Sequence, residues 1–303
     1  MKRIRLAFAL ILFSVSALAQ TARRTASFEA VSVKPNTLPG AGGPFGSVGV
    51  CAGGRPQIDP RRFAATATVY VLISWAYGRD CANSEQHNLL TGGPNWVRKD
   101  LFAIQAVVPE GSPSYSMLQL FDGQAPNLQA MIQTLLADRF KLKIHSESRV
   151  MPVYVLKVDR NGSKLQPFEE GSCDFPTGPQ PQSEKLDQKR PWCSFGVETI
   201  PDRTARRVRI AADGVTLEKF AQLLSLDLDS PVIDQTGIPG KFAFRVIYAS
   251  ARPTGVQPDI GTAQATDATL STALREQLGL RLESARGPVE VLVVDSVERP
   301  SEN

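Results

Sequence analysis

The chain has 303 residues, of which 42% are hydrophobic and 21% are charged, and its formal net charge is +4. This composition suffices for an ordinary hydrophobic core and excludes a disordered chain. The length leaves room for one large domain or two small ones.

Residues 1–19 are predicted to be a cleaved signal peptide. Residues 2–5 carry three basic side chains, residues 6–15 are predominantly apolar, and residues 17–19 fit the small-x-small rule for cleavage. Cleavage near Ala19 would remove three positive charges and no negative ones, which lowers the formal net charge from +4 to +1. No Lys/Arg cluster then remains to attract nucleic acid, which we exclude as a partner. The alternative is an uncleaved N-terminal anchor.

The rest of the chain contains no candidate for a membrane-spanning helix, because no later run approaches the roughly 20 apolar residues that such a helix needs. Gln20 follows the cleavage site, where a lipoprotein would have a cysteine. We therefore expect a soluble mature protein without a transmembrane segment, located in the periplasm or outside the cell.

The four cysteines are Cys51, Cys81, Cys173 and Cys193. Export favours disulfides over a metal site, and no C-x-x-C spacing suggests zinc. Of the three connectivities that four cysteines allow, Cys51–Cys81 and Cys173–Cys193 close the shortest loops and stay within their own regions. We predict these two disulfides, no metal site and no cofactor.

The first predicted elements of the mature chain are a strand and a Gly-rich loop in residues 20–57. The side chains of residues 28–33 alternate between apolar and polar, and the strand is expected to end at Lys34-Pro35, since proline cannot extend a central ladder. An α/β unit is expected over residues 58–160. Its first helix begins after Thr68, whose hydroxyl can cap the helix, and an alternating strand follows at residues 102–107.

The second half of this unit changes its apolar period. A spacing of four at residues 132, 136 and 140 predicts a helix, and a spacing of two at residues 140, 142 and 144 predicts a strand. After a turn, residues 152–159 are predicted to form another strand. The unit thus reads strand, helix, strand, strand, helix, strand, strand.

An internal repeat predicts a second such unit over residues 205–303. Residues 152–159 and 288–295 are identical at six of eight positions, and the apolar residues of 132–144 recur at an offset of 138. Thr216 is placed to cap the first helix of the second unit, as Thr68 does in the first. We therefore predict an α+β fold built from two tandem, diverged copies of a small β-α-β-β-α-β-β unit with mixed sheets.

Residues 161–204 are rich in proline and are predicted to be a linker between the two copies, stapled by Cys173–Cys193. Residues 109–127 and 250–267 are long loops at the same place in each copy. Loops of this length are usually functional or disordered.

Few residues suggest catalysis. His145, with Glu147 two residues on, could be a base with its orienting carboxylate, and Ser47 lies in a Gly-rich segment without the spacing of a nucleophile elbow. No catalytic residue is assigned. The binding candidates are Trp96, on a Gly-Gly-Pro-Asn-Trp turn, and Arg139, at the end of a helix. Both also have structural interpretations: Trp96 can fold back onto the sheet, and Arg139 can interact with the helix dipole.

Several motifs resemble one family of exported, mainly acidobacterial and soil-associated proteins of uncharacterised function. They lie at residues 28–36, 92–96, 135–142, 232–240, 277–280 and 299–303. Each copy also resembles, more distantly, the short N-terminal domain of secretins and TonB-dependent receptors, through its Thr-Leu…Leu-Leu helix, its Gly240-Lys241 turn and its helix ending in Leu-Gly-Leu. That second resemblance implies periplasmic docking of another protein.

The sequence thus favours an exported binding or docking module that recognises an envelope protein, a peptide or another ligand. An exported hydrolase with residues such as His145, Glu147 and Ser47, and a purely structural envelope protein, are the alternatives.

Overall fold

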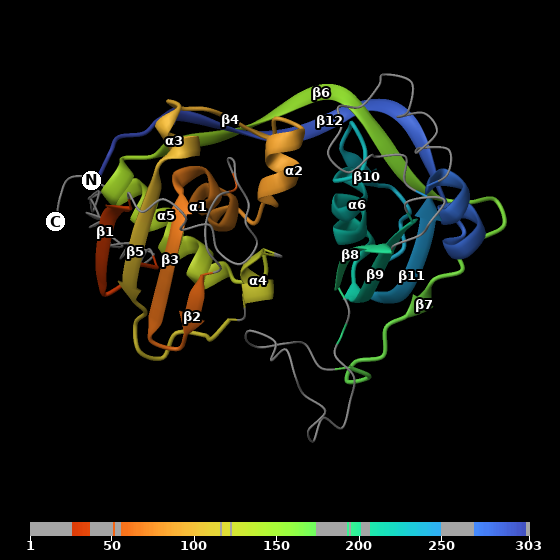
Figure 1. Ribbon diagram of the computed structural model, residues 1–303, viewed down its shortest axis with the longest axis horizontal. Coiled ribbons are helices and arrows are strands. Elements are labelled where there is room, and N and C mark those ends of the chain that lie inside the picture. The colour runs from red at the N-terminus through yellow and green to blue at the C-terminus, as the bar shows by residue number, and fades with distance from the viewer. Residues whose placement is uncertain are drawn as a thin grey trace, which may run out of the picture.

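The computed structural model describes residues 26–36, 51, 56–115, 117–121, 123–173, 193, 195–200, 207–249 and 270–300. The predicted signal peptide and Ser47 lie outside these residues. The described chain forms two lobes beneath a long two-stranded ribbon (Figure 1). It contains helices, two antiparallel sheets and one mixed sheet, which agrees with the predicted α+β class.

Lobe 1 is built on an antiparallel sheet with the strand order β1-β5-β3-β2. Its strands are β1 (Ala30–Asn36), β2 (Gln57–Asp59), β3 (Arg62–Thr68) and β5 (Leu101–Val107). Its helices are α1 (Val69–Ala76), α2 (Cys81–Gln86), α3 (Trp96–Lys99), α4 (Met117–Phe121) and α5 (Pro126–Phe140). The predicted strand at 102–107 is confirmed by β5.

The core of lobe 1 forms where the predicted helices cover this sheet. Thr68 caps α1 by accepting a hydrogen bond from the amide of Val71, and every residue of α1 is buried. The Phe102 ring of β5 meets the Phe140 ring of α5 edge to face, with ring centroids 5.2 Å apart. β1 continues through Pro35, beyond its expected end, because β1 is an edge strand whose outer side needs no donor.

Lobe 2 is built on a second antiparallel sheet, with the order β7-β11-β9-β8. Its strands are β7 (Gln166–Pro167), β8 (Phe195–Ile200), β9 (Arg207–Val215) and β11 (Phe242–Ala249). Its helices are α6 (Leu217–Ser225) and a helical segment that begins at Leu270 and ends in the π-helix η1 (Leu274–Leu278). Thr216 caps α6, as predicted, and Phe220 of α6 packs on Phe244 of β11 with ring centroids 4.4 Å apart.

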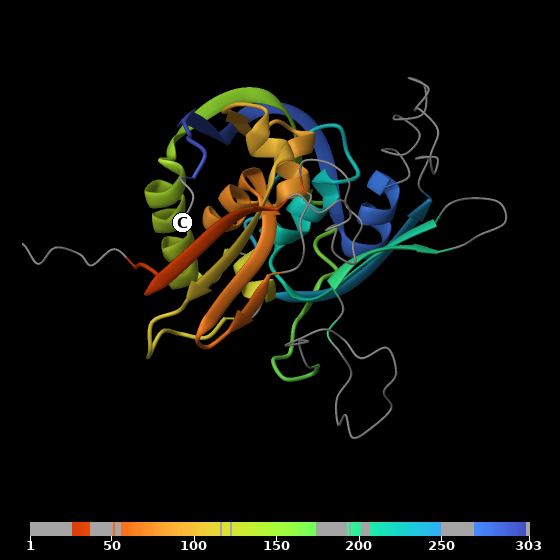
Figure 2. The same cartoon turned by 60° about the vertical axis from the view of Figure 1, so that its left-hand side comes forward.

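The ribbon consists of β6 (Lys143–Val158) and β12 (Leu280–Ser296), which pair antiparallel along almost their whole length. The short strands β4 (Leu90–Gly92) and β10 (Val232–Asp234) pair parallel to its outer edges, giving the order β10-β6-β12-β4. The ribbon arches over both lobes (Figures 1 and 2).

Each ribbon strand begins in one lobe and ends in the core of the other. β6 follows α5 of lobe 1, yet its Leu156 is fully buried in the core of lobe 2. β12 begins in lobe 2, yet its Leu292 and Val294 belong to the core of lobe 1. The two lobes therefore exchange strands.

The prediction of two strands joined by a turn at the end of each copy was wrong. Residues 143–158 form one continuous strand, and residues 280–296 form another. The polar stretch before Pro152 suggested a turn, but these residues are polar because the middle of the ribbon is exposed. Gly287-Pro288 likewise lies within β12. The backbone amide of Leu292 donates to the Leu89 carbonyl oxygen, on the side of β12 that faces away from β6. The backbone nitrogen of Pro288, four residues earlier, points to the same side. β4 pairs only with residues 292–294, so Pro288 removes no hydrogen bond between strands.

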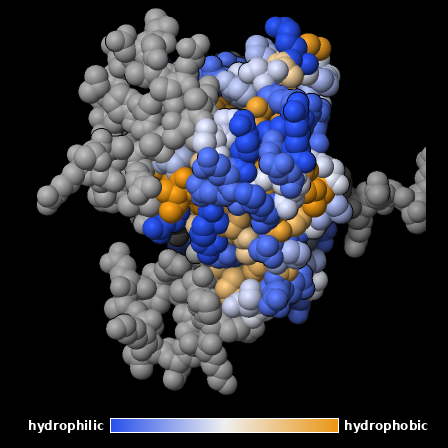
Figure 3. All heavy atoms as spheres, turned by 90° about the vertical axis from the view of Figure 1, so that its right-hand side faces the viewer, coloured by the Kyte–Doolittle hydropathy of each residue, from blue (hydrophilic) through white to orange (hydrophobic). Residues whose placement is uncertain are grey.

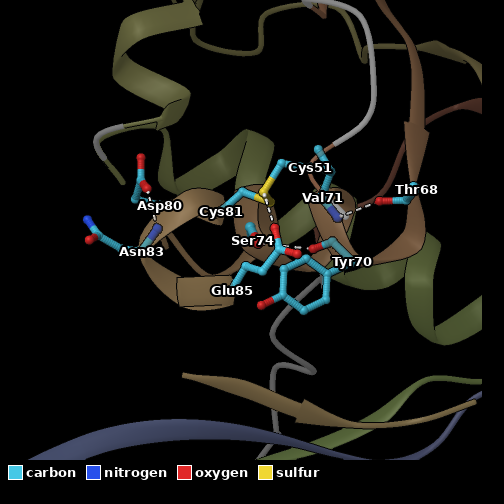
Figure 4. The surroundings of a disulfide bond; sticks show 9 residues. All are labelled: Cys51, Thr68, Tyr70, Val71, Ser74, Asp80, Cys81, Asn83 and Glu85. Carbon is cyan, nitrogen blue, oxygen red and sulfur yellow. Dashed lines mark hydrogen bonds between the residues drawn. A yellow bond between two sulfur atoms is a disulfide. The ribbon is translucent and has the colours of Figure 1, made fainter. Parts of the chain in front are cut away.

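The predicted disulfides Cys51–Cys81 and Cys173–Cys193 are both present. The first ties the start of α2 to Cys51 (Figure 4). Within the described ranges, no helix has the length and apolar character needed to cross a membrane.

Candidate functional site

A cavity of about 700 Å³ lies between the two lobes, under the ribbon. Lobe 1 contributes residues between Tyr77 and Leu89, and lobe 2 contributes one face of α6 together with β10. The ribbon contributes Ser146, residues 288–290 and Leu292. Figure 1 shows α2 and α6 facing each other below the ribbon. The volume is within the range of sites that hold small ligands, roughly 300–1,000 Å³.

Gln86, the last residue of α2, and His87, which follows it, connect the two lobes beside this cavity. The amide nitrogen of Gln86 donates to the carbonyl oxygens of Leu228, at 2.5 Å, and Ser225, at 3.2 Å. His87 Nε2 lies 2.9 Å from the same Ser225 oxygen, a contact in which this nitrogen carries the proton. The last carbonyls of a helix have no partner within the helix. Lobe 1 therefore supplies donors that the C-terminal end of α6 lacks.

Asn83 makes a third contact across the lobes and leaves one atom unsatisfied. Its Nδ2 donates to the Gln222 carbonyl oxygen at 2.7 Å, which fixes the orientation of the amide group. Its Oδ1 is buried and has no hydrogen-bond partner. The residue as a whole is 6% exposed and is one of those that line the cavity. Figure 4 shows the Asn83 side chain beside Asp80, directed away from the Cys51–Cys81 disulfide. A buried acceptor of this kind calls for an explanation, since nearly all such groups are paired.

Glu290 of the ribbon is held as a carboxylate on the cavity wall. It accepts a hydrogen bond from the Ser146 hydroxyl at 2.8 Å and pairs with the Arg79 guanidinium at 2.7 Å. The hydrogen bond from Ser146 and then the charge of Arg79 lower the pKa of Glu290 below its ordinary value. Arg79 is thus already neutralised by Glu290.

The other charged groups on the wall are mainly acidic. Asp80 accepts a hydrogen bond from the backbone amide of Asn83 at the start of α2, and Asp234 accepts one from the backbone amide of Thr236. Glu218 is exposed in the first turn of α6, where the helix dipole favours a negative charge. Among the described lining residues, Arg79 is the one Lys or Arg. The cavity wall therefore carries an excess of negative charge.

His145 lies on the ribbon outside the cavity. Its Nδ1 is 2.9 Å from Asp295, while its Nε2 is 3.9 Å from Glu147, the carboxylate that the sequence suggested as its partner. Side chains alternate along a strand. Because Ser146 faces the cavity, the half-exposed His145 faces the other side of the ribbon. His145 is therefore not one of the residues that line the cavity.

The two binding candidates from the sequence also lie away from the cavity. Trp96 packs edge to face on Phe102 with ring centroids 6.1 Å apart, and the Arg299 guanidinium lies 5.1 Å from the centroid of the Trp96 ring. Arg139 donates to the backbone oxygen of Val31 at 3.2 Å and so holds β1 against α5. Both residues make structural contacts within lobe 1.

Sequence reasoning missed Asn83 and Glu218. They lie far apart in the chain, on separate helices, and neither belongs to a motif. The one available signal was indirect: the predicted Cys51–Cys81 disulfide indicates a tethered segment at Cys81, but the sequence did not predict that this segment is the helix α2.

No group of three or more His, Cys, Asp and Glu side chains in the described part of the chain is arranged to hold a metal ion.

Comparison with known families gives one match. A family model described as "Protein of unknown function (DUF3738)" matches residues 71–297. No curated protein and no solved structure matches the chain. The matched span runs from α1 almost to the end of the described chain, so it includes both lobes, the ribbon and the cavity.

Proposed function

The chain belongs to the DUF3738 family, and we propose that it is an exported binding protein that holds a small ligand between its two lobes. The cavity carries this proposal. It is preformed, it has the volume of a small-molecule site, and its walls come from both lobes and the ribbon.

Export of this binding protein is supported by its two disulfides. Disulfides form and persist in oxidising compartments, such as the periplasm and the extracellular space, and are rare in the cytosol. Both Cys51–Cys81 and Cys173–Cys193 are compatible with that location.

We also infer that the two lobes arose by duplication, with the last strand of each copy exchanged between them. The repeat that makes residues 152–159 match residues 288–295 relates Leu156 to Leu292. Leu156 pairs with Asp234 on β10, and Leu292 pairs with Leu90 on β4. Equivalent residues thus have equivalent short parallel neighbours. A duplicated pair of lobes under a shared ribbon would naturally enclose a cavity between them.

Docking of an envelope protein or peptide is the other form of recognition, implied by the resemblance to the secretin domain. A docking surface of the usual kind would offer a contiguous apolar patch. On the face shown in Figure 3, hydrophilic residues predominate among the described atoms. Over all described residues, the exposed large hydrophobic side chains are Val107 and Val150, so we base the proposal on the cavity.

The proposal is tested by blocking the cavity with an uncharged side chain. Gln222 is partly exposed on the cavity face of α6, so Gln222→Trp should fill the space without changing the charge. The matched control is Asn161→Trp, in an exposed turn that does not line the cavity. Native mass spectrometry of protein isolated from its envelope, and thermal-shift measurements with a metabolite library, should show a ligand bound to the wild type and the control but not to Gln222→Trp. Equal binding to all three would refute the proposal.

A further inference from the structure

We propose that the two lobes open and close about the middle of the ribbon, and that Asn83, Gln86 and His87 form a latch that holds the cavity closed. The opening is a property of the fold and needs no ligand. Only its consequence, the access of a ligand to the cavity, rests on the proposed function.

The apolar cores of the two lobes are separate, so the lobes can part without exposing either core. The buried apolar residues of the described chain form two clusters, one in each lobe. Four buried polar residues line the cavity where the lobes meet, namely Asn83, Ser84, His87 and Ser225. Relative motion is the ordinary expectation for two units whose contact is not large and hydrophobic.

Helix α2 meets lobe 2 through polar groups. Its buried residues are Asn83 and Ser84, so no apolar side chain of α2 is buried. Asn83, Gln86 and His87 bind backbone oxygens of lobe 2 through side-chain nitrogens. Water replaces such hydrogen bonds when the groups separate, and each bond therefore contributes only modestly to the closed form.

The closed form also contains a strained requirement that opening relieves. Asn83 Oδ1 is buried without a partner, while Nδ2 of the same amide group contacts Gln222 of lobe 2. A buried acceptor without a partner is unfavourable. Parting the lobes removes lobe 2 from this amide group and gives water access to it. The donors of the latch thus favour the closed form, and the Asn83 acceptor favours the open one.

The ribbon is narrowest between the lobes. β4 pairs with residues 292–294 of β12, and β10 pairs with residues 154–156 of β6. Between these ends, residues 147–153 and 285–291 pair with each other and with no other described strand. A two-stranded segment has fewer pairing interactions to resist bending than the wider ends have. This segment is therefore the hinge, and the contact between α2 and α6 below it is where the lobes part (Figure 1).

The Cys51–Cys81 disulfide keeps the latch intact in the open form. A helix as short as α2 is not stable by itself in water. The disulfide attaches its first residue to Cys51, and Asp80 accepts a hydrogen bond from the Asn83 amide (Figure 4). Neither contact involves lobe 2, so the donors of the latch keep their positions and the latch can close again.

Distances between spin labels measure this opening directly. The labels would be attached through a ketone-bearing amino acid at two exposed positions, Gln57 in lobe 1 and Lys241 in lobe 2, which leaves both native disulfides intact. Double electron–electron resonance on the full chain without ligand records the distribution of distances. A second label pair, at Gln57 and the exposed Lys99, lies within lobe 1 and shows whether that lobe moves as a rigid body.

Gln86→Leu is the main variant, because it removes the donor to two oxygens of lobe 2. We expect the ratio of open to closed molecules to rise about 5- to 30-fold, which corresponds to about 1–2 kcal/mol at 1.36 kcal/mol for each factor of ten. The Gln57–Lys241 distribution should then gain a component at longer distance. The matched control is Gln166→Leu, at an exposed position outside the cavity, which should leave the distribution as in the wild type.

The inference is supported if Gln86→Leu alone of the two variants enlarges the longer-distance component while the Gln57–Lys99 distance stays constant. It is overturned if the wild type and Gln86→Leu give the same distribution, or if Gln166→Leu has an equal effect. A change in the Gln57–Lys99 distance also overturns it, because lobe 1 would then be unfolding.

The proposed function fails or stands separately. A rigid cavity can still bind a ligand that Gln222→Trp excludes, so failure of the opening leaves the proposed function in place. Equal ligand binding by the wild type and Gln222→Trp refutes the proposed function, and leaves an opening measured without ligand unaffected.

Discussion

Leu156 offers the sharpest test of the strand exchange. It lies on β6, directly downstream of lobe 1 in the chain, but its side chain is fully buried in the core of lobe 2. Leu156→Ala should therefore weaken lobe 2. Leu292→Ala, on β12, should weaken lobe 1, because Leu292 is only 2% exposed and packs there.

The expected size follows from burial. Replacing a fully buried leucine by alanine usually costs about 2–5 kcal/mol, since transfer energy is lost and a cavity is left behind. We take about 3 kcal/mol for Leu156. At 1.36 kcal/mol for each factor of ten, this corresponds to an increase of about 150-fold in the equilibrium constant for unfolding of the lobe that contains the side chain.

Native-state hydrogen exchange read by mass spectrometry resolves the two lobes. In Leu156→Ala, protection should fall most in α6 and β9, and less in α1 and α5. In Leu292→Ala the order should reverse. Val150→Ala is the control on β6, because Val150 is 65% exposed and its truncation should leave protection nearly unchanged.

A loss of protection confined to lobe 1 in Leu156→Ala would refute this reasoning. That result would mean that residues 152–159 fold back on their own half of the chain, as the turn expected from the sequence would have required.

Two further predictions concern the contacts around the cavity. Gln86→Leu keeps the approximate size of the side chain but removes the donor to the Leu228 and Ser225 carbonyl oxygens, so urea unfolding should show a free energy of unfolding lower by about 1–2 kcal/mol. The control Gln166→Leu, at an exposed position, should change this free energy by less than about 0.5 kcal/mol. Equal losses in the two variants would contradict the role of the α2–α6 contact. Glu290 has a lowered pKa in the folded state, so its contribution is present above the unfolded value and is lost as the pH falls through the folded one. Unfolding free energies at pH 7 and pH 3.5 should therefore differ less in Glu290→Gln than in the wild type, and an unchanged difference would show that Ser146 and Arg79 do not stabilise this carboxylate.

The sequence by itself determined the local structure of this protein. Thr68 and Thr216 were identified as helix caps because a cap depends on an amide only three residues away. Helix α5 and strand β5 followed from apolar periods of four and two, which are properties of the chain within one element. Helices α2, α3 and α4 were not predicted, and strands β7 and β8 lie within the predicted linker. The disulfide pairing was also predictable, because the shortest loops were the ones that closed.

The tertiary structure alone decided where the strands go and which residues meet. An apolar period of two shows that one face of a strand is buried, but it does not show which core buries it. Leu156 and Leu292 could each have packed on their own half of the chain. The polar middle of the ribbon resembled a turn because both are exposed to water.

The cavity was unpredictable for the same reason. Asn83 and Glu218 belong to different lobes, and the bond between Asn83 and Gln222 joins residues 139 positions apart. Their meeting depends on the ribbon, whose two strands cross from one lobe to the other and hold α2 against α6. Local sequence encodes the helices, but the distance between them is set by long-range strand pairing, which no local pattern specifies.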